Sequence, residues 1–244
     1  MKSIQSRQNE KFKTWLSLLE GRGIKKQRQA IISGSRLVSE FLKLHSSLAR
    51  ELLVPSKNAS HIDAPKVEVF DLATELFREL DIFGTKSPLL VVETPSLEPW
   101  IEHPPKGLEL IVALSDPGNL GAVLRSALAF NANRVVLCQE CSSPFLPKAI
   151  RASSGACFAL PLIAGPSIHE IKPQSAHCLD LEGEALTQFQ WPQDLSLVLG
   201  EEGQGIPQSL HAKALTIPIH NKSESLNAMA AASIALFSYR SAWP

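Results

Sequence analysis

Two neighbouring stretches in the last fifty residues decide the fold of this chain: LSLVLGEEGQGIP, from Leu195 to Pro207, and LTIPIHNKSESLNAMAAASIALFSYR, from Leu215 to Arg240. Each stretch begins with a short apolar run that is typical of a buried strand, and each run breaks into a polar turn. The three glycines of the first turn allow the backbone to approach a neighbour closely. The second turn leads into an Ala-rich helix that we expect to begin near Leu226. Two strand ends that open into turns side by side predict a ligand crevice in an open α/β sheet.

Four segments in the second half of the chain resemble the motifs of one enzyme family. GEEGQGIP is similar to the second motif of the SpoU (TrmH) branch of the SPOUT RNA methyltransferases, and IPIHNKSESLNAMAAASIALF is similar to the third. DPGNLGAVLRSALAF (116–130) resembles the first motif, and PKAIRASSGACFALPL (147–162) resembles the helix and strand that follow it. The resemblance covers residues 108–240. It implies an α/β domain whose C-terminal segment threads through a loop as a trefoil knot, and S-adenosyl-L-methionine as the cofactor.

A smaller α/β domain is predicted over residues 1–92. Apolar residues at helical spacing predict helices over 8–20, 33–44 and 72–80, the first of them ended by Gly21 and Gly23. Short apolar runs predict strands over 30–32, 51–54, 67–70 and 88–92. This region also resembles the RNA substrate-binding domain of many SpoU enzymes, itself similar to a ribosomal RNA-binding protein. The proline-rich residues 93–107 predict a linker, and residues 108–244 are then the methyltransferase domain.

The charge of the chain is unevenly distributed. The formal net charge is zero, but residues 1–92 carry +5 and the remainder carries −5. A basic N-terminal lobe suits a polyanionic partner such as RNA, whereas a solvated helix face is the simpler interpretation of charge alone. Together with the resemblance, this pattern predicts RNA contacts at six basic residues: Lys11, Lys13, Lys25, Lys26, Arg28 and Arg36.

Composition excludes several classes of protein. A hydrophobic share of 44% is ordinary for a globular protein, and no apolar run approaches the roughly 18 residues of a membrane span. The N-terminus lacks the apolar core of a signal peptide, so we expect a cytoplasmic protein without membrane contacts. Cys138 and Cys141 form a C-x-x-C pair with no second pair, which favours buried free thiols and no metal over a zinc site or disulfide framework.

The first motif contains a strand, a turn and a helix. LELIVAL (108–114) predicts a buried strand, SDPGN a turn, and LGAVLRSALAF (120–130) a helix. From spacing alone, Asn119 is a helix N-cap. Arg125 is equally well explained as a solvent-exposed surface residue and as a residue that binds an anion. No P-loop or G-x-G-x-x-G fingerprint is present. In the final helix, Met229, Ile234 and Leu236 are expected to lie in the core.

The resemblance assigns two sets of site residues. The catalytic set is Asn119, Arg125, Glu202, Ser225 and Asn227. The cofactor-binding set is Leu199, Gly200, Gly203, Ile217 and Leu226. Each polar residue also has a simpler explanation, helix capping for the serine and the asparagines and a solvated loop for the glutamate. Glu201 stands where the family usually has asparagine.

The function implied is transfer of a methyl group to a ribose 2′-hydroxyl in rRNA or tRNA. A ribose hydroxyl is a poor nucleophile at neutral pH, so catalysis needs alignment and removal of one proton. The resemblance gives that proton to Arg125. Because a guanidinium stays protonated in nearly all protein settings, Arg125 could instead grip the neighbouring phosphate.

Two other functions remain open from the sequence. A non-catalytic RNA-binding protein could use the same scaffold, and Glu201 and the zero net charge motivate that alternative. A small-molecule methyltransferase is disfavoured by the basic N-terminal lobe. In the family, the last helix and the motif-one helix pack across a two-fold axis. The apolar faces of the helix expected over 226–243 therefore predict a homodimer.

Overall fold

The chain forms two compact units in the computed structural model, which describes residues 2–56, 67–172, 176–200, 205–220 and 225–244. Unit 1 contains residues 1–96 and 143–158, and unit 2 contains residues 97–142 and 159–244. The expected linker, 93–107, is thus divided between the units and includes a short strand, β6 (Glu98–Pro99). Segment 143–158 lies within the region that resembles the methyltransferases, yet it packs with the N-terminal residues.

Unit 1 is built on a five-stranded mixed sheet with the strand order β1-β4-β3-β5-β2. Its strands are β1 (Lys2–Ile4), β2 (Gln29–Ser33), β3 (Ala49–Pro55), β4 (Glu68–Leu72) and β5 (Leu89–Glu93). Strands β1, β4 and β3 are parallel, whereas β5 is antiparallel to both of its neighbours. Its helices are α1 (Glu10–Ser17), α2 (Gly21–Gln27), α3 (Ser35–Leu44), α4 (Thr74–Leu80) and α6 (Pro147–Ser153). The predicted α/β organisation of this region is confirmed.

The helix predicted over 8–20 is α1, and α2, which was not predicted, follows it. Asn9 caps α1 by accepting from the backbone N–H groups of Lys11 and Phe12. The prediction that Gly21 and Gly23 end this helix is wrong, because α1 ends at Ser17 and both glycines lie in α2. A Cβ atom on Gly23 would lie 1.9 Å from the carbonyl oxygen of Ser17, so this glycine permits the close packing of the two helices.

Unit 2 is built on a seven-stranded parallel sheet with the strand order β12-β10-β11-β7-β8-β9-β6. Besides β6, its strands are β7 (Leu108–Val112), β8 (Arg134–Leu137), β9 (Leu162–Ala164), β10 (His177–Ala185), β11 (Leu195–Leu199) and β12 (Ala214–Thr216). Strands β7 and β11 are fully buried, as a parallel sheet covered on both faces requires. The chain moves outward from β7 through β8 and β9, and β10 and then β11 lie on the opposite side of β7. This reversal next to β7 is where an open α/β sheet presents its ligand crevice.

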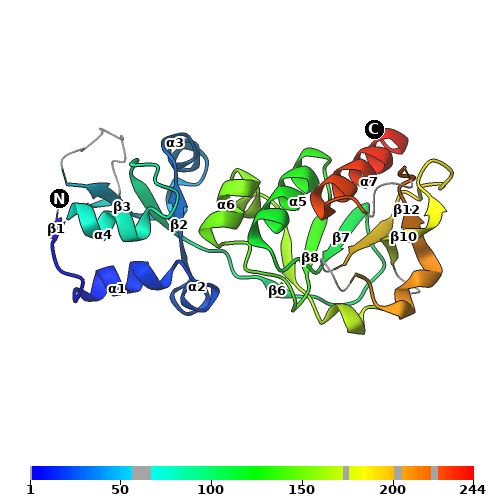
Figure 1. The fold of residues 1–244 in the computed structure, drawn as a ribbon, viewed down its shortest axis with the longest axis horizontal. Coiled ribbons are helices and arrows are strands. Elements are labelled where there is room, and N and C mark those ends of the chain that lie inside the picture. The colour runs from blue at the N-terminus through cyan, green and yellow to red at the C-terminus, as the bar shows by residue number, and fades with distance from the viewer. Residues whose placement is uncertain (1, 57–66, 173–175, 201–204, 221–224) are drawn as a thin grey trace. The chain divides into compact units, whose positions relative to one another are not determined.

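Two long helices of unit 2, α5 (Pro117–Ala129) and α7 (Ala228–Ala242), lie side by side (Figure 1). The hydroxyls of Ser126 and Ser233 join them at 2.9 Å. The prediction that Met229 and Ile234 are core residues is wrong, since 39% of the surface of Met229 and 42% of that of Ile234 are exposed. Leu236 is buried, as predicted. One face of α7 is therefore packed, and another presents apolar side chains at the surface of the unit.

Strand β10 was not predicted. Its sequence, HCLDLEGEA, is acidic and contains a glycine, so it lacks the apolar run of a central strand. It forms because β11 and β12 hydrogen-bond to it on both sides, with an irregularity between Leu179 and Glu184. Among the described residues, no helix is long and apolar enough to cross a membrane.

Candidate active site

A cavity of about 600 Å³ lies beside the middle of β10 and the carboxyl ends of β11 and β12. It is also lined by the first turn of α5 and by the segment that leads into α7. Seven of the predicted site residues line it: Asn119, Leu199, Gly200, Ile217, Ser225, Leu226 and Asn227. Residues of the two C-terminal stretches and of the first motif therefore meet at one cavity, as expected. The expectation that the two C-terminal strand ends lie side by side is wrong, because β10 lies between β11 and β12. A cavity of this size is typical of small-molecule and cofactor sites.

Gly200 shapes one wall of the cavity by close approach of the backbone. A Cβ atom at this position would lie 2.4 Å from the carbonyl oxygen of Gly205 and 2.7 Å from the side chain of Ile206. Gly205 itself has a φ of +71°, a left-handed conformation that favours glycine. The backbone conformation at Gly200 and at Gly205 thus depends on glycine.

Two asparagines meet beside the cavity. Asn227 Nδ2 donates to Asn119 Oδ1 at 3.4 Å, and Asn227 Oδ1 accepts from the backbone N–H of Met229 at 2.8 Å. Asn227 is therefore the N-cap of α7, as its simpler explanation required. Asn119 is not the N-cap of α5, because Asp116 occupies that position and accepts from the Asn119 backbone N–H at 2.9 Å.

Arg125 is exposed on α5 and is not among the residues that line the cavity. Within the described part of the chain, no hydrogen bond or ion pair engages its guanidinium. The structure therefore leaves its charge available to a partner from outside the unit. Its catalytic role stays a prediction.

Asp180 is a cavity residue that the sequence did not indicate. It lies on β10, and its carboxylate is the one charged side chain among the described residues that line the cavity. Its Oδ1 accepts from the Leu181 backbone N–H at 2.7 Å, and its Oδ2 lies 3.4 Å from His211 Nε2. The neighbouring thiol of Cys178 has a pKa raised to about 12, first by burial and then by the charge of Asp180. Because β10 escaped prediction, no local signal marked this residue.

Two predicted site residues, Glu202 and Gly203, lie outside the described residues, as does Glu201. Their assignments stay predictions. The cysteines are free, and three of the four are buried. Burial raises the pKa of Cys157 to about 12 and raises that of Cys138 further. In the described ranges, no group of three or more His, Cys, Asp or Glu side chains could hold a metal ion.

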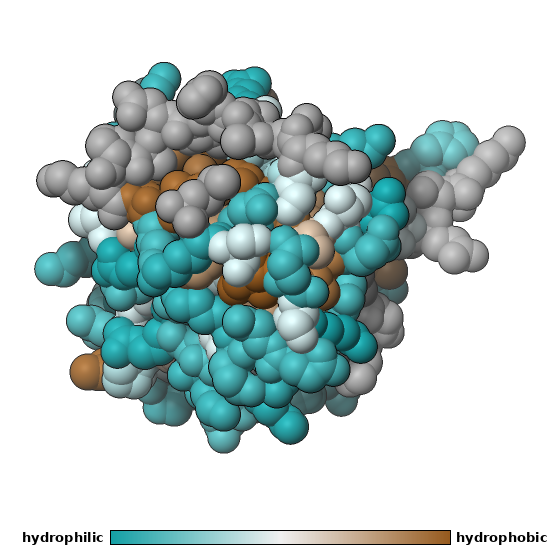
Figure 2. Space-filling view, turned by 90° about the vertical axis from the view of Figure 1, so that its left-hand side faces the viewer, coloured by the Kyte–Doolittle hydropathy of each residue, from teal (hydrophilic) through white to brown (hydrophobic). Residues whose placement is uncertain are grey.

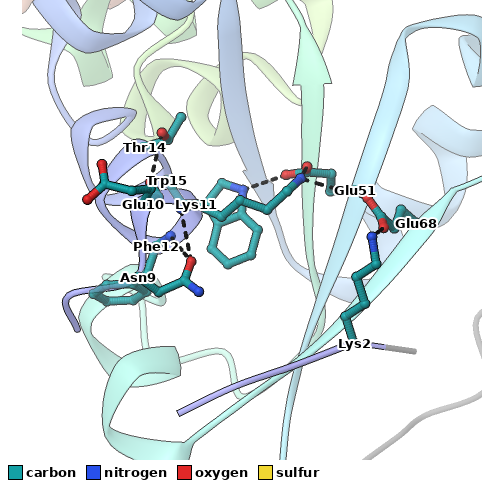
Figure 3. A network of polar contacts seen from close by, with 9 residues as sticks. All are labelled: Lys2, Asn9, Glu10, Lys11, Phe12, Thr14, Trp15, Glu51 and Glu68. Atoms are coloured by element: carbon teal, nitrogen blue, oxygen red, sulfur yellow. Dashed lines mark hydrogen bonds and ion pairs between the residues drawn. The ribbon is translucent and has the colours of Figure 1, made fainter. Parts of the chain in front are cut away.

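The predicted RNA-binding residues of unit 1 fall into two groups. Lys11 belongs to an internal network in which it pairs with Glu51 and lies 3.7 Å from Glu68, while Trp15 Nε1 donates to Glu51 at 2.5 Å (Figure 3). Its ammonium also lies 4.6 Å from the ring centroid of Phe70. These contacts give Lys11 a structural role in joining α1 to β3.

Other predicted RNA-binding residues are engaged more lightly. Lys13 pairs with Glu10 at 2.6 Å, Arg36 with Glu40 at 2.9 Å, and the Arg28 guanidinium donates to Ser96 at 2.6 Å. These contacts are exposed, so water and salt weaken them.

Lys25 and Lys26 differ from the rest of the group. Both are exposed on the last turn of α2, and the described residues supply no ion-pair partner for either. The face of unit 1 that includes β1 and α4 is mostly hydrophilic (Figure 2). Unit 1 therefore presents two exposed ammonium groups on α2 and at least one face that is largely polar.

The fold and the cavity define a class: an open parallel α/β sheet with a cavity of small-molecule size beside β10, β11 and β12. Residues 109–237 match the SpoU rRNA Methylase family. This match spans more than half of the chain and every strand that contributes to the cavity, so the chain belongs to the SpoU rRNA methylase family.

Individual relatives resemble the chain over nearly its whole length. It is 38% identical over 98% of its length to ribosomal RNA small subunit methyltransferase G 2 of Syntrophobacter fumaroxidans, but it spans only 49% of that protein. It is 28% identical to the 23S rRNA (guanosine(2553)-2′-O)-methyltransferase RlmP of Bacillus subtilis, covering 98% of this chain and 100% of that one. The crystal structure of an AdoMet-bound rRNA methyltransferase from Sinorhizobium meliloti has the same fold, with a TM-score of 0.79 at 22% identity, covering 100% of this chain and 98% of that one.

Proposed function

We propose that this protein is an RNA methyltransferase that methylates a ribose 2′-hydroxyl of ribosomal or transfer RNA with S-adenosyl-L-methionine. The observation that carries the proposal is the position of the family match. Every described residue that lines the cavity lies within the range that matches the family, and the side chains of Asn119 and Asn227 meet there. Relatives that match the chain along nearly its whole length include a 23S rRNA 2′-O-methyltransferase.

The size of the cavity and the residues that line it suit the cofactor. The backbone approach at Gly200 leaves apolar walls from Leu199, Ile217 and Leu226 that suit an adenine ring. Asp180 adds one negative charge, which complements a ligand of net positive charge. When bound, S-adenosylmethionine supplies a methyl group that is already activated by its sulfonium sulfur. The residues of the chain then need only to hold the acceptor in line and to assist loss of its proton.

The positions of the polar residues suggest a different role for each in aligning the acceptor and assisting loss of its proton. Asn119 and Asn227 are close enough to orient a shared group at the mouth of the cavity, and Ser225 lines the same wall. Arg125 is exposed and has no partner in the described chain, so it suits an anion brought by the substrate. A guanidinium binds a phosphate at two points, and we assign Arg125 that role in preference to that of a base. Glu202 keeps its proposed role in orienting the ribose.

Unit 1 is proposed to hold the RNA through its phosphates. The exposed ammonium groups of Lys25 and Lys26 support this part of the proposal most directly. Arg28, Lys13 and Arg36 also lie on its surface in exposed pairs that phosphates could replace. The protein would then use one unit to hold its substrate and the other to bind its cofactor.

A second copy of the chain is the proposed partner of α5 and α7. Four large apolar side chains on these helices, Leu128, Met229, Ile234 and Phe237, are between 39% and 62% exposed. The rings of Phe130 and Phe237 pack with their centroids 6.3 Å apart and extend this surface. An exposed apolar face of this kind marks an interaction site, and a symmetric pair of chains would cover it. Light scattering at micromolar concentration should give twice the mass of one chain.

The direct test of the proposed function is to map ribose methylation in total RNA from a strain that lacks the gene and from its parent. Loss of one 2′-O-methyl site that returns with the wild-type gene, but not with Arg125→Ala, supports the proposal. Identical methylation maps would favour the non-catalytic alternative, an RNA-binding protein on this scaffold.

A further inference from the structure

We infer that Asp180 is the counter-ion for the positive charge of S-adenosylmethionine and makes the cavity discriminate between this cofactor and its demethylated product. The inference rests on the proposed function. It concerns a residue on β10 that lies outside the glycine turn and the motif residues considered above. Asp180 is the one charged side chain among the described residues that line the cavity, which are otherwise apolar or neutral.

The chemistry of the cofactor makes a single carboxylate among the described lining residues informative. The amino-acid end of S-adenosylmethionine carries one positive and one negative charge, so its net charge of +1 comes from the sulfonium. A trisubstituted sulfonium has no hydrogen to donate, so its recognition depends on Coulomb attraction rather than on a hydrogen bond. When the methyl group leaves without the C–S electron pair, that pair stays on sulfur and the product becomes a neutral thioether. The sulfonium charge is thus the property that separates the two ligands.

The surroundings of Asp180 allow its charge to act on a ligand in the cavity. Its side chain is 24% exposed, so water screens it less than it would screen a surface carboxylate. One oxygen is held by the Leu181 backbone N–H at 2.7 Å, and the other lies 3.4 Å from His211 Nε2. His211 is held in turn at 3.2 Å from the Ile206 carbonyl oxygen. The carboxylate is therefore fixed in place before a ligand arrives.

A preference of this kind has a consequence for turnover. Before transfer, the carboxylate stabilises the bound cofactor through its positive charge. After transfer, the same carboxylate faces a neutral sulfur and no longer adds to affinity. Asp180 would then help the protein to exchange product for fresh cofactor, without contacting the RNA.

The test is calorimetric titration of the full-length protein with three ligands: S-adenosylmethionine, S-adenosylhomocysteine and sinefungin. Sinefungin carries an ammonium in place of the methylated sulfur and so keeps the positive charge. In Asp180→Asn we expect the affinity for the two cationic ligands to fall by about tenfold, and that for the neutral product by less than about threefold. Glu182→Gln is the matched control, because it removes an exposed carboxylate from the same strand and should change none of the three affinities.

The outcomes separate this inference from the proposed function. Equal losses for all three ligands would show that Asp180 binds a group common to them, and unchanged affinities would show that it serves the fold; either result overturns the inference and leaves the proposed function standing. Wild-type protein that binds none of the ligands would overturn both. If Asp180→Asn does not fold, the wild-type protein decides the question. Its affinity for S-adenosylmethionine should fall with added salt more steeply than its affinity for the product, and parallel salt dependences would overturn the inference.

Discussion

The side-chain amide of Asn227 donates to the side-chain carbonyl of Asn119 at 3.4 Å, across 108 positions of sequence. This contact joins the first turn of α5 to the N-cap of α7 beside the cavity. Through these two side chains, the first motif contacts the third. Asn227 combines this contact with a second task, since its carbonyl oxygen caps α7.

The two tasks of Asn227 can be separated by substitution. Aspartate caps a helix as well as asparagine does but cannot donate to Asn119. We expect Asn227→Asp to melt within a few degrees of wild type and to transfer methyl at least about tenfold more slowly. Asn227→Ala should lose the cap as well and be less stable by about 1 kcal/mol. Thermal melts and single-turnover methyl transfer distinguish the two, and a fully active Asn227→Asp would reduce this residue to its capping role.

Arg125 should matter for transfer and not for stability. It is exposed and has no partner within the described chain, so Arg125→Ala should change the free energy of unfolding by less than about 0.5 kcal/mol. Cofactor affinity should stay within about threefold, while single-turnover transfer falls by about 100-fold or more. Arg125→Lys should remain impaired, because an ammonium cannot bind phosphate at two points. Arg240→Ala, which removes another exposed arginine of unit 2, is the control; wild-type transfer by Arg125→Ala would remove Arg125 from the site.

Gly200 should be required for cofactor binding. A methyl group at this position would lie 2.4 Å from the Gly205 carbonyl oxygen, so the turn after β11 has to move in Gly200→Ala. We expect S-adenosylmethionine affinity to fall by about tenfold or more, because the displaced turn forms a wall of the cavity. Gly21→Ala is the control, since its Cβ would meet only Ser143 at an ordinary 3.8 Å. Unchanged calorimetric titration of Gly200→Ala would mean that ligands bind away from this turn.

RNA affinity should depend on Lys25 and Lys26 more than on Lys11. The double variant Lys25→Ala, Lys26→Ala should bind substrate RNA more weakly and lower the slope of log affinity against log salt by about 2. Lys11→Ala should instead lower the melting temperature, because Lys11 pairs with Glu51 and lies over the ring of Phe70 within its own unit. Lys106→Ala, an exposed lysine of unit 2, controls for the loss of charge. Filter binding across a salt series measures all three, and an unchanged slope in the double variant would exclude α2 from the RNA contact.

Short apolar runs in the sequence predicted the strands whose own residues are buried. The runs at Leu108–Val112 and Leu195–Leu199 were predicted as buried strands from their apolar character, and both are fully buried. That they pair as parallel neighbours is a result of the structure. Strand β10 escaped prediction because it owes its conformation to its two neighbours, and Asp180 was missed with it. Asn119 was mistaken for an N-cap because Asp116, three residues earlier, takes that position.

Long-range packing accounts for the remaining differences. Segment 143–158 follows the first motif, but Phe158 packs against Phe41 of unit 1, with ring centroids 4.9 Å apart. No spacing rule reports such a contact between distant segments. It also follows that deleting residues 1–92 would uncover Phe158, so point substitutions test the RNA-binding role of unit 1 more cleanly than truncation does.

The most direct test of the central claim is methyl transfer by the purified full-length protein to RNA from a strain that lacks its gene. Radiolabelled S-adenosylmethionine would supply the methyl group, and the RNA would be digested with alkali after a single turnover. A 2′-O-methyl group blocks attack of the ribose oxygen on the adjacent phosphate, so label on ribose survives in alkali-resistant dinucleotides. The account predicts label in one such dinucleotide with wild-type protein and none with Arg125→Ala. Label in mononucleotides, or no label from protein that binds the cofactor, would contradict it.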